Sequence, residues 1–209
     1  MRIVLSVLLF TFLFTSLQAQ EKEGFRFDLM GVYGIGFGVA ENSNEPDYNF
    51  RTRQIDLILN FDFGKLFGFA TGVGVSTLSA NGFNSNGDFF QTRNSLKIPL
   101  SLSMLHPISE QFEFYASGGF FWEQILEDEF QYLNSTLEDV YEGSGFGGQF
   151  QIGLFLNPPD NIDWAESRIG ILAGAQLGSN QETSEFSGGN NTLDLGDIFS
   201  LSVVASLAF

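Results

Sequence analysis

Cysteine is absent from this chain of 209 residues, and lysine and arginine are scarce. Without cysteine there is no disulfide framework, and no cysteine can carry an N-terminal lipid anchor. Only 9 Lys and Arg stand against 25 Asp and Glu, which gives a formal net charge of -16. So negative a chain would be repelled by the phosphates of a nucleic acid. We therefore expect no nucleic-acid partner.

Long apolar runs are also missing beyond the first residues. Residues 1–19 combine an early Arg2, an apolar run and a small residue at Ala19, which is typical of a cleaved secretory signal peptide. In residues 20–209, which we expect to form a single domain, no stretch approaches the roughly 18 apolar residues of a spanning helix. A place in a membrane then requires a closed β-barrel, because closure leaves no strand edge unpaired in lipid.

The chain is rich instead in short alternating segments. It contains 24 Gly and 25 Phe but 5 Pro, which suits many strands with close backbone approach and argues against disorder. From Phe25 onward apolar side chains recur at every second position, the period of a strand with one apolar face. The alternation predicts eight strands, at residues 25–39, 54–63, 67–77, 95–104, 112–123, 146–156, 168–178 and 199–209.

The last segment shows this pattern clearly. Its length suits a tilted strand that crosses a bilayer, and it ends on an aromatic residue. Serine and other small residues occupy the alternate positions. We predict that it closes the barrel, with an apolar face made by Phe199, Leu201, Val203, Leu207 and Phe209.

The connections between the segments alternate in length. The second, fourth and sixth are short, whereas the others are long, at residues 40–50, 79–92, 127–142 and 179–197. Bacterial single-chain barrels have short periplasmic turns and longer extracellular loops. The sequence therefore predicts an all-β, eight-stranded antiparallel up-and-down transmembrane barrel in the outer membrane, with both termini in the periplasm. A ten-stranded barrel is the alternative, if Phe130–Leu133 pairs with Leu137–Tyr141 as a further hairpin.

The polar face of the strands separates a membrane barrel from a soluble barrel or sandwich, in which the Phe-rich faces would pack inside. It carries Gly, Ser, Gln and charges, which suit the narrow interior of an eight-stranded membrane barrel. Buried charges must be paired, so we expect Asp28 beside Arg26, and Asp56 and Glu113 near Lys97 and Arg168. The predicted interior ion network, which would plug the lumen, comprises Arg26, Asp28, Asp56, Asp62, Lys97, Glu113, Glu123 and Arg168.

The four long connections contain 14 acidic residues and no Lys or Arg. Such connections project a negative field, which either keeps them solvated or forms a surface that binds divalent cations or a cationic partner. Asn84–Asp88 resembles a calcium loop but lacks its spaced carboxylates and distal Glu. Just below the first long connection, Arg51 and Arg53 fall on the lipid-facing side near the expected outer rim. There they would meet lipid phosphates.

Candidate catalytic residues are few. His106 is the single histidine, and it lies beside Pro107 in a turn expected at the periplasmic end. An enzyme that acts on outer-leaflet lipid would need its base near the outer rim. We therefore predict no enzymatic activity, no cofactor and no bound catalytic metal.

One hairpin resembles a known family. Leu96–Leu102, which reads Leu-Lys-Ile-Pro-Leu-Ser-Leu, precedes a turn and the run Phe112–Phe121. Together they resemble the central hairpin of the PorT-like outer-membrane β-barrels of Bacteroidetes. The resemblance implies an integral outer-membrane protein without catalytic residues. Pro99 cannot donate to a β-ladder, so we expect it at a bulge or a locally unpaired position.

The sequence thus favours an outer-membrane barrel with a structural or surface-interaction role. A narrow channel and an accessory component of an outer-membrane secretion or assembly machine are the alternatives. The expected partners are outer-membrane lipid and the machinery that inserts barrels.

Overall fold

The computed structural model describes residues 25–42, 45–63, 67–157, 167–182, 192–195 and 197–208. The expected signal peptide and the terminal Phe209 lie outside this part of the chain. Within it, no helix is long and apolar enough to span a bilayer.

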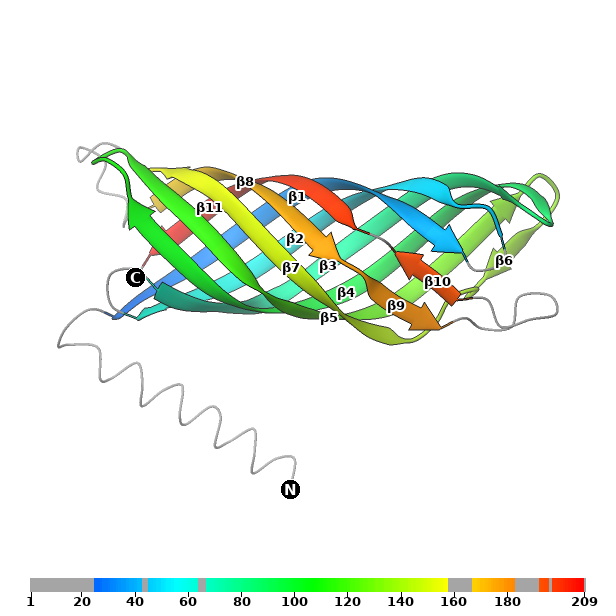
Figure 1. The fold of residues 1–209 in the computed structure, drawn as a ribbon, viewed down its shortest axis with the longest axis horizontal. Helices are drawn as coiled ribbons and strands as arrows, with labels where there is room; N and C mark the ends of the chain where they lie inside the picture. Colours follow the sequence, from blue (N-terminus) through cyan, green and yellow to red (C-terminus); the bar gives the residue numbers. More distant parts are fainter. Residues whose placement is uncertain are drawn as a thin grey trace, which may run out of the picture.

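Eight long strands form a closed antiparallel ring, as Figure 1 shows. Neighbours along the chain pair with one another, and the last strand pairs with the first from Asp28–Ala208 to Phe37–Phe199. The expected all-β, eight-stranded up-and-down architecture is therefore confirmed. The ring strands are β1 (Phe25–Asn42), β2 (Tyr48–Phe63), β3 (Phe67–Asn84), β4 (Gly87–Pro107), β5 (Phe112–Tyr132), β7 (Ser144–Leu156), β8 (Ser167–Leu177) and β11 (Ile198–Ala208).

Three short strands extend the wall at the end of the barrel away from the C-terminus (Figure 1). They are β6 (Thr136–Glu138), β9 (Ser179–Glu182) and β10 (Thr192–Leu195). β9 pairs with β10, which pairs with the end of β1, and β6 folds back on β5 so that Phe130 lies opposite Leu137. The ten-stranded alternative is therefore wrong, because this hairpin lies beyond the ring and adds no strand to it.

Two of the expected long loops are largely strand. Residues 79–92 continue β3 and β4 to a tight turn at Ser85 and Asn86, where the Asn84 side chain accepts a hydrogen bond from the Asn86 amide at 2.9 Å. Gly87 follows with a φ of 112°, which glycine adopts without strain. β5 likewise runs on to Tyr132. The prediction of loops was wrong here because a strand that extends above the membrane can carry polar residues on both faces. Such a strand lacks the alternation of apolar and polar residues by which strands were recognised.

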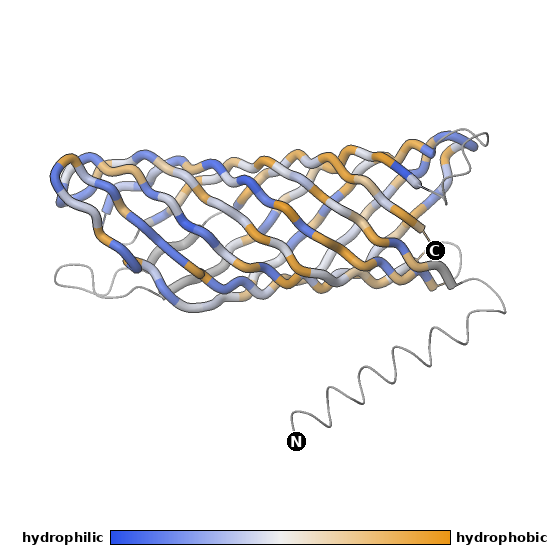
Figure 2. The backbone as a smooth tube through the Cα atoms, turned by 180° about the vertical axis from the view of Figure 1, so that it is seen from behind, coloured by the Kyte–Doolittle hydropathy of each residue, from blue (hydrophilic) through white to orange (hydrophobic). Residues whose placement is uncertain are grey.

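The two faces of the wall differ as the alternation predicted. Phe120 is 69% exposed whereas its neighbour Phe121 is 4% exposed, and the predicted outward residues Phe199, Leu201, Val203 and Leu207 of β11 are exposed as well. In Figure 2 the apolar segments concentrate in the half of the barrel nearer the C-terminus, and hydrophilic segments dominate the far end. This arrangement contradicts the soluble alternative, in which the Phe faces would lie inside.

Aromatic rings that point inward lie over glycines of the adjacent strand. A Cβ atom at any of these glycines would collide with the ring, so the missing side chain makes room for it. Such aromatic–glycine pairs help to fix strand register. Three such pairs, each directly opposite in register, are Gly38 with Phe50, Gly82 with Phe89 and Gly147 with Phe121.

The ladder between β3 and β4 is interrupted at Pro99. Its register passes from Thr71–Leu100 to Gly74–Lys97 and skips the pairs between them. The Thr71 hydroxyl donates a hydrogen bond of 2.9 Å to the Pro99 carbonyl and so replaces part of the missing ladder. The expectation of a locally unpaired position is confirmed.

A β-bulge in β5 reverses which residues point inward. The β4–β5 register shifts between Asn94 and Ser95, which pair with Glu127 and Ile125, and Leu126 is left as the extra residue. As a result Ile125 and Asp128 are both buried. In a regular strand, residues three positions apart would point to opposite faces. The bulge aims Asp128 into the barrel instead of at solvent.

Candidate functional site

The interior of the barrel is the site to which the sequence assigned most of its charges. Side chains fill it in three successive layers from the C-terminal end to the far end. We call them the inner, middle and outer layers.

The inner layer is centred on Arg168 at the start of β8. Its guanidinium forms ion pairs with Asp28 of β1 and with Glu113 of β5, the latter at 2.6 Å. The guanidinium also lies 5.2 Å from the ring centroid of Phe155. Arg168 and Asp28 are almost completely buried, so each charge is neutralised where water cannot solvate it. The structure thus brings together three of the predicted network residues from strands far apart in sequence.

Asp62 lies in the same layer. Its carboxylate accepts a hydrogen bond of 2.7 Å from Asn60, which accepts one from Ser103. Arg26 pairs in backbone register with Asp62, but its side chain lies outside the described part of the structure. Apolar side chains complete the layer: Met30, Val32, Tyr115, Phe155, Leu172 and Val204.

The middle layer is built around Lys97, which is buried. Its ammonium lies 4.0 Å from the ring centroid of Phe121, and Asp56 and Glu123 are the carboxylates that act on it electrostatically. Asp56 accepts a hydrogen bond of 2.8 Å from Gln54. One cation thus faces two anions, with glutamines and an aromatic ring between them. All three charged residues belong to the network predicted from the sequence.

Two cavities in this region measure about 20 Å³ each. One is lined by Asp56, Lys97 and Gln149, and the other by Gln54, Glu123 and Gln176. A cavity of this size holds about one water molecule. Each cavity therefore has room for a water molecule beside polar side chains and is too small to hold a solute.

The outer layer contains an ion pair that the sequence did not reveal. Arg93 of β4 and Asp128 of β5 are at most 1% exposed, and their closest atoms, Nε and Oδ1, are 3.1 Å apart. Gln91 also donates to Oδ1 at 2.7 Å, and the Tyr141 backbone amide donates to Oδ2 at 3.1 Å. The hydroxyl of Tyr48 completes the network by donating to Gln91 at 2.7 Å. Three donors thus hold the carboxylate.

Aromatic rings surround this ion pair. The Arg93 guanidinium lies 5.0 Å from the Tyr141 ring centroid. Phe89 packs edge-on against Tyr48, with centroids 5.1 Å apart, and Phe130 lies 4.8 Å from Phe89. The buried apolar cluster at this end comprises Ala40, Tyr48, Phe50, Leu78, Ala80, Phe89, Ile125, Phe130, Val140 and Tyr141.

The dry surroundings change the acid–base properties of the outer layer. Burial raises the pKa of Asp128, and the nearby Arg93 opposes this shift without cancelling it. Burial also raises the pKa of Tyr141 to about 12 and holds the pKa of Tyr48 well above its usual range. Burial thus raises the pKa of all three acidic groups of the outer layer.

The surface at the outer-layer end is acidic. Asp128 does not contribute to this acidic surface, because its side chain is buried and paired with Arg93. The 14 acidic residues counted in the long connections therefore include one that is not at the surface. Glu45 instead joins two connections, since its carboxylate accepts bonds from the Ser85 amide and hydroxyl at 3.1 and 2.7 Å. The described exposed carboxylates of the predicted long connections are Glu41, Asp47, Asp88, Glu127, Glu138, Asp139, Glu142 and Asp197. Among the described residues, no three acidic or histidine side chains converge as a metal site would require.

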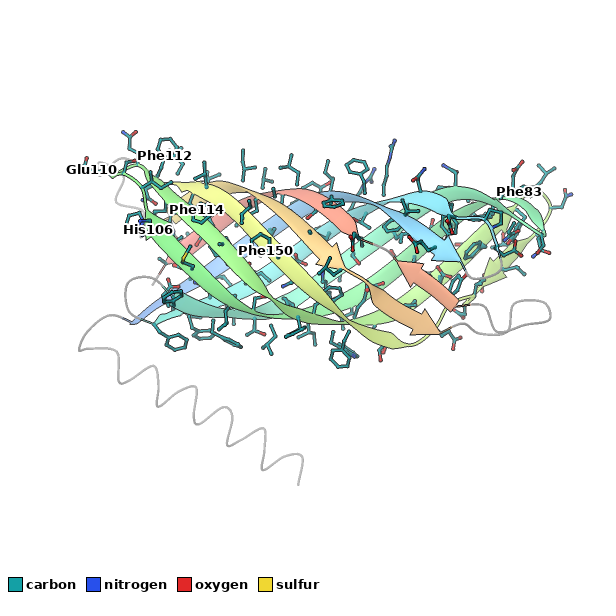
Figure 3. All side chains as sticks on the ribbon, in the orientation of Figure 1. Phe83, His106, Glu110, Phe112, Phe114 and Phe150 are labelled. Atoms are coloured by element: carbon teal, nitrogen blue, oxygen red, sulfur yellow. The ribbon has the colours of Figure 1, made fainter. Side chains whose placement is uncertain are left out.

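His106, Arg51 and Arg53 lie on the outside of the barrel. His106 is exposed and lies near Glu110 at the opposite end of the barrel from Phe83, as Figure 3 shows. It is thus remote from the outer layer. Arg51 and Arg53 are exposed on the outer face of β2.

No protein-family model matches the chain, and no curated protein matches it. The resemblance to PorT-like barrels therefore stays a prediction. Solved structures match its fold. The outer membrane protein OprG from Pseudomonas aeruginosa gives a TM-score of 0.61 at 10% identity, over 90% of this chain and 97% of that chain.

Two further structures are similar at lower scores. A major outer membrane protein from Thermus thermophilus gives a TM-score of 0.49 at 13% identity, over 90% of this chain and 100% of that chain. Neisserial surface protein A gives a TM-score of 0.48 at 12% identity, over 90% of this chain and 98% of that chain. Because OprG is only 10% identical in sequence, its similarity shows a shared fold and nothing about function. The chain has the fold of an outer-membrane β-barrel.

Proposed function

We propose that this protein is an integral outer-membrane barrel with a plugged lumen, and that it acts through its outer surface as a structural or surface-interaction protein. The observation that carries the proposal is the reversal of ordinary protein polarity. Apolar side chains cover the outside, while paired charges and hydrogen-bonded amides fill the inside. Such a wall is stable in lipid and carries nothing through its centre.

The packed interior favours this reading over a channel. The layers contain ion pairs and cation–aromatic contacts, the Gln176 amide of β8 donates across the lumen to Gln54 of β2 at 2.9 Å, and the two cavities of about 20 Å³ have room for about one water each. An ion would have to displace these paired groups in order to pass. We therefore expect no steady conductance.

The orientation follows from the connections. The turn at residues 108–111 lies at the end that holds the C-terminus, whereas the β3–β4 and β5–β6 hairpins extend the opposite end (Figure 1). We place the C-terminal end in the periplasm and the outer-layer end outside the cell. The barrel-insertion machinery and outer-membrane lipid are its expected partners.

The acidic outer end is the surface that would meet other molecules. Its exposed carboxylates are not gathered into a metal site among the described residues, so divalent cations would be held there diffusely, as a bridge to anionic glycan. A cationic protein partner would use the same field. A role as an accessory of a secretion or assembly machine remains the alternative, and co-purifying partners would reveal it.

The proposal is tested first by heat modifiability. The mature chain is extracted from membranes in mild detergent and run on a gel with and without boiling. A folded form that migrates differently from the boiled form and fractionates with outer membranes supports the barrel. A water-soluble protein without a mobility shift would refute it.

Orientation and closure need two further measurements. An epitope inserted between Ser85 and Asn86 should be detected on intact cells, whereas the matched insertion between Ser109 and Glu110 should be detected only after the outer membrane is opened. In a planar bilayer the purified barrel should give no stepwise current, with an open porin as the positive control. Steady current steps would favour the channel instead.

A further inference from the structure

Arg51 and Arg53 stand apart from the other cations of the barrel. Five Lys and Arg side chains are described, and Arg93, Lys97 and Arg168 among them are buried in the lumen. Arg51 and Arg53 are the two that are exposed, and both point outward from β2. Within the described part of the chain, neither guanidinium takes part in an ion pair. Two cations without protein partners thus share one outer face.

Their height on the wall places them at a membrane surface. The outward residues of β2 are apolar from Phe63 to Ile55, and Arg53 is the next outward residue. Ten residue steps of about 3.3 Å at a tilt of about 40° raise Arg53 about 25 Å above Phe63. This is about the height of the apolar band of an outer-membrane barrel. Arg53 therefore lies where the hydrocarbon ends, and Arg51 lies one step above it.

The two arginines line an open concavity of about 790 Å³ on the outside of the barrel. Asn49 and Ser79 contribute further hydrogen-bonding groups to its wall, and the exposed rings of Phe37 and Phe90 contribute apolar surface. Guanidinium groups bind phosphate through paired hydrogen bonds, whereas exposed phenyl rings bind hydrocarbon. The concavity thus offers cationic, hydrogen-bonding and apolar surface together.

We propose that this concavity binds a phosphorylated glycolipid of the outer leaflet, with its phosphate on Arg51 and Arg53 and its apolar body against Phe37. The inference rests on the proposed orientation, which puts these arginines in the outer leaflet. Charge complementarity selects the ligand, because an anionic headgroup at this height meets two cations that no carboxylate of the described chain neutralises. An uncharged lipid would leave both guanidinium groups at the interface without an anion.

The test is native mass spectrometry of the full mature barrel in nonionic detergent. The probes are synthetic lipid A with two phosphates and its dephosphorylated form. Each interfacial cation contributes about fivefold to affinity for an anionic lipid, so R51Q/R53Q should weaken binding of the phosphorylated lipid by about 25-fold. R51K/R53K retains both charges and should stay within about fivefold of the wild type. The E138Q/D139N control alters exposed charges away from the concavity and should change affinity less than about twofold.

Several outcomes would overturn the proposal. Wild-type protein that binds both lipid forms equally would exclude phosphate recognition, and this comparison needs no variant. Equal binding by wild type and R51Q/R53Q would exclude the arginines. Displacement of the lipid by millimolar inorganic phosphate would indicate a site for free anions. A heat-modifiable barrel that fails to bind the lipid refutes this inference alone, whereas a chain without a heat-modifiable form refutes the proposed function.

Discussion

The substitution Arg93→Met removes the cation from the ion pair of the outer layer. Methionine has nearly the length of the arginine stem and leaves the aromatic cluster filled. Asp128 would keep its hydrogen bonds from Gln91 and from the Tyr141 amide but lose its neutralising charge. The perturbation therefore isolates the electrostatic contribution of one buried guanidinium.

The expected loss of stability is large. The two closest atoms are 3.1 Å apart, and both side chains are at most 1% exposed, so water cannot replace the missing partner. Removing one member of such a pair costs about 3–5 kcal/mol. The double variant R93M/D128N leaves no charge to bury and keeps an oxygen that can accept from Gln91 or the Tyr141 amide, so it should be clearly more stable than R93M.

The pH dependence gives a second readout. Burial already raises the pKa of Asp128, and without Arg93 nothing comparable opposes this shift. A carboxyl whose pKa is higher in the folded state is most favourable below the unfolded pKa of about 3.9, and its contribution is lost as the pH rises through the folded pKa. R93M should therefore regain stability relative to the wild type as the pH is lowered from 7 toward 4.

The assay is urea unfolding in phosphatidylcholine vesicles, with the folded fraction read from gel mobility without boiling. Glu127→Gln is the matched control, since Glu127 is adjacent in sequence but exposed, and it should shift the free energy of unfolding by less than about 0.5 kcal/mol. A loss below about 1 kcal/mol in R93M would refute the reasoning. So would a double variant that is as unstable as the single one.

Three further predictions concern other positions. Gly74→Ala would bring a methyl group against Oδ1 of Asp56, so we expect a loss of about 1–3 kcal/mol in the same urea assay. Between pH 10 and 12 the barrel should lose stability, because the pKa of Tyr141 rises to about 12 on folding while the unfolded value is about 10; Y141F should lack that part of the loss in a pH series. Deletion of Leu126 removes the extra residue of the bulge and should turn Asp128 outward, which faster hydrogen exchange of the Tyr141 amide would show.

The wall of the barrel was predictable from the sequence because its signal is local. On β2, every second residue from Ile55 to Phe63 is apolar and, apart from Ile58, the residues between them are polar, a period that indicates a strand with one apolar face. The buried positions of Lys97 and Arg168 were also predictable, since both residues fall on the polar face. Their partners were harder to assign. Asp28 meets Arg168 only because the ring closes, and closure joins residues 140 positions apart.

The outer layer was not predictable for two physical reasons. The bulge at Leu126 inverts the inward and outward positions, so the alternation below it places Asp128 on the wrong face. Above the apolar band, a strand that faces water has no reason to be apolar outside, and Gln91 was therefore assigned to a loop, while Arg93 fell between that loop and the next predicted strand. A sequence signal did exist in the buried aromatic residues Phe89 and Phe130, which would have been unusual in exposed loops.

The inner layer has a consequence for how the barrel assembles. Arg168 is on β8, Asp28 is on β1, and between these strands lies only β11, whose pairing with β1 closes the ring. In a sheet that is still open between β11 and β1, Arg168 keeps Glu113 as its partner, but Asp28 on the edge strand β1 is separated from Arg168 and would enter the bilayer without that cation. Because an unpaired charge in hydrocarbon is costly, half-closed forms are penalised and closure becomes nearly all-or-none. The charges that fill the finished barrel thus also act against its unfinished forms.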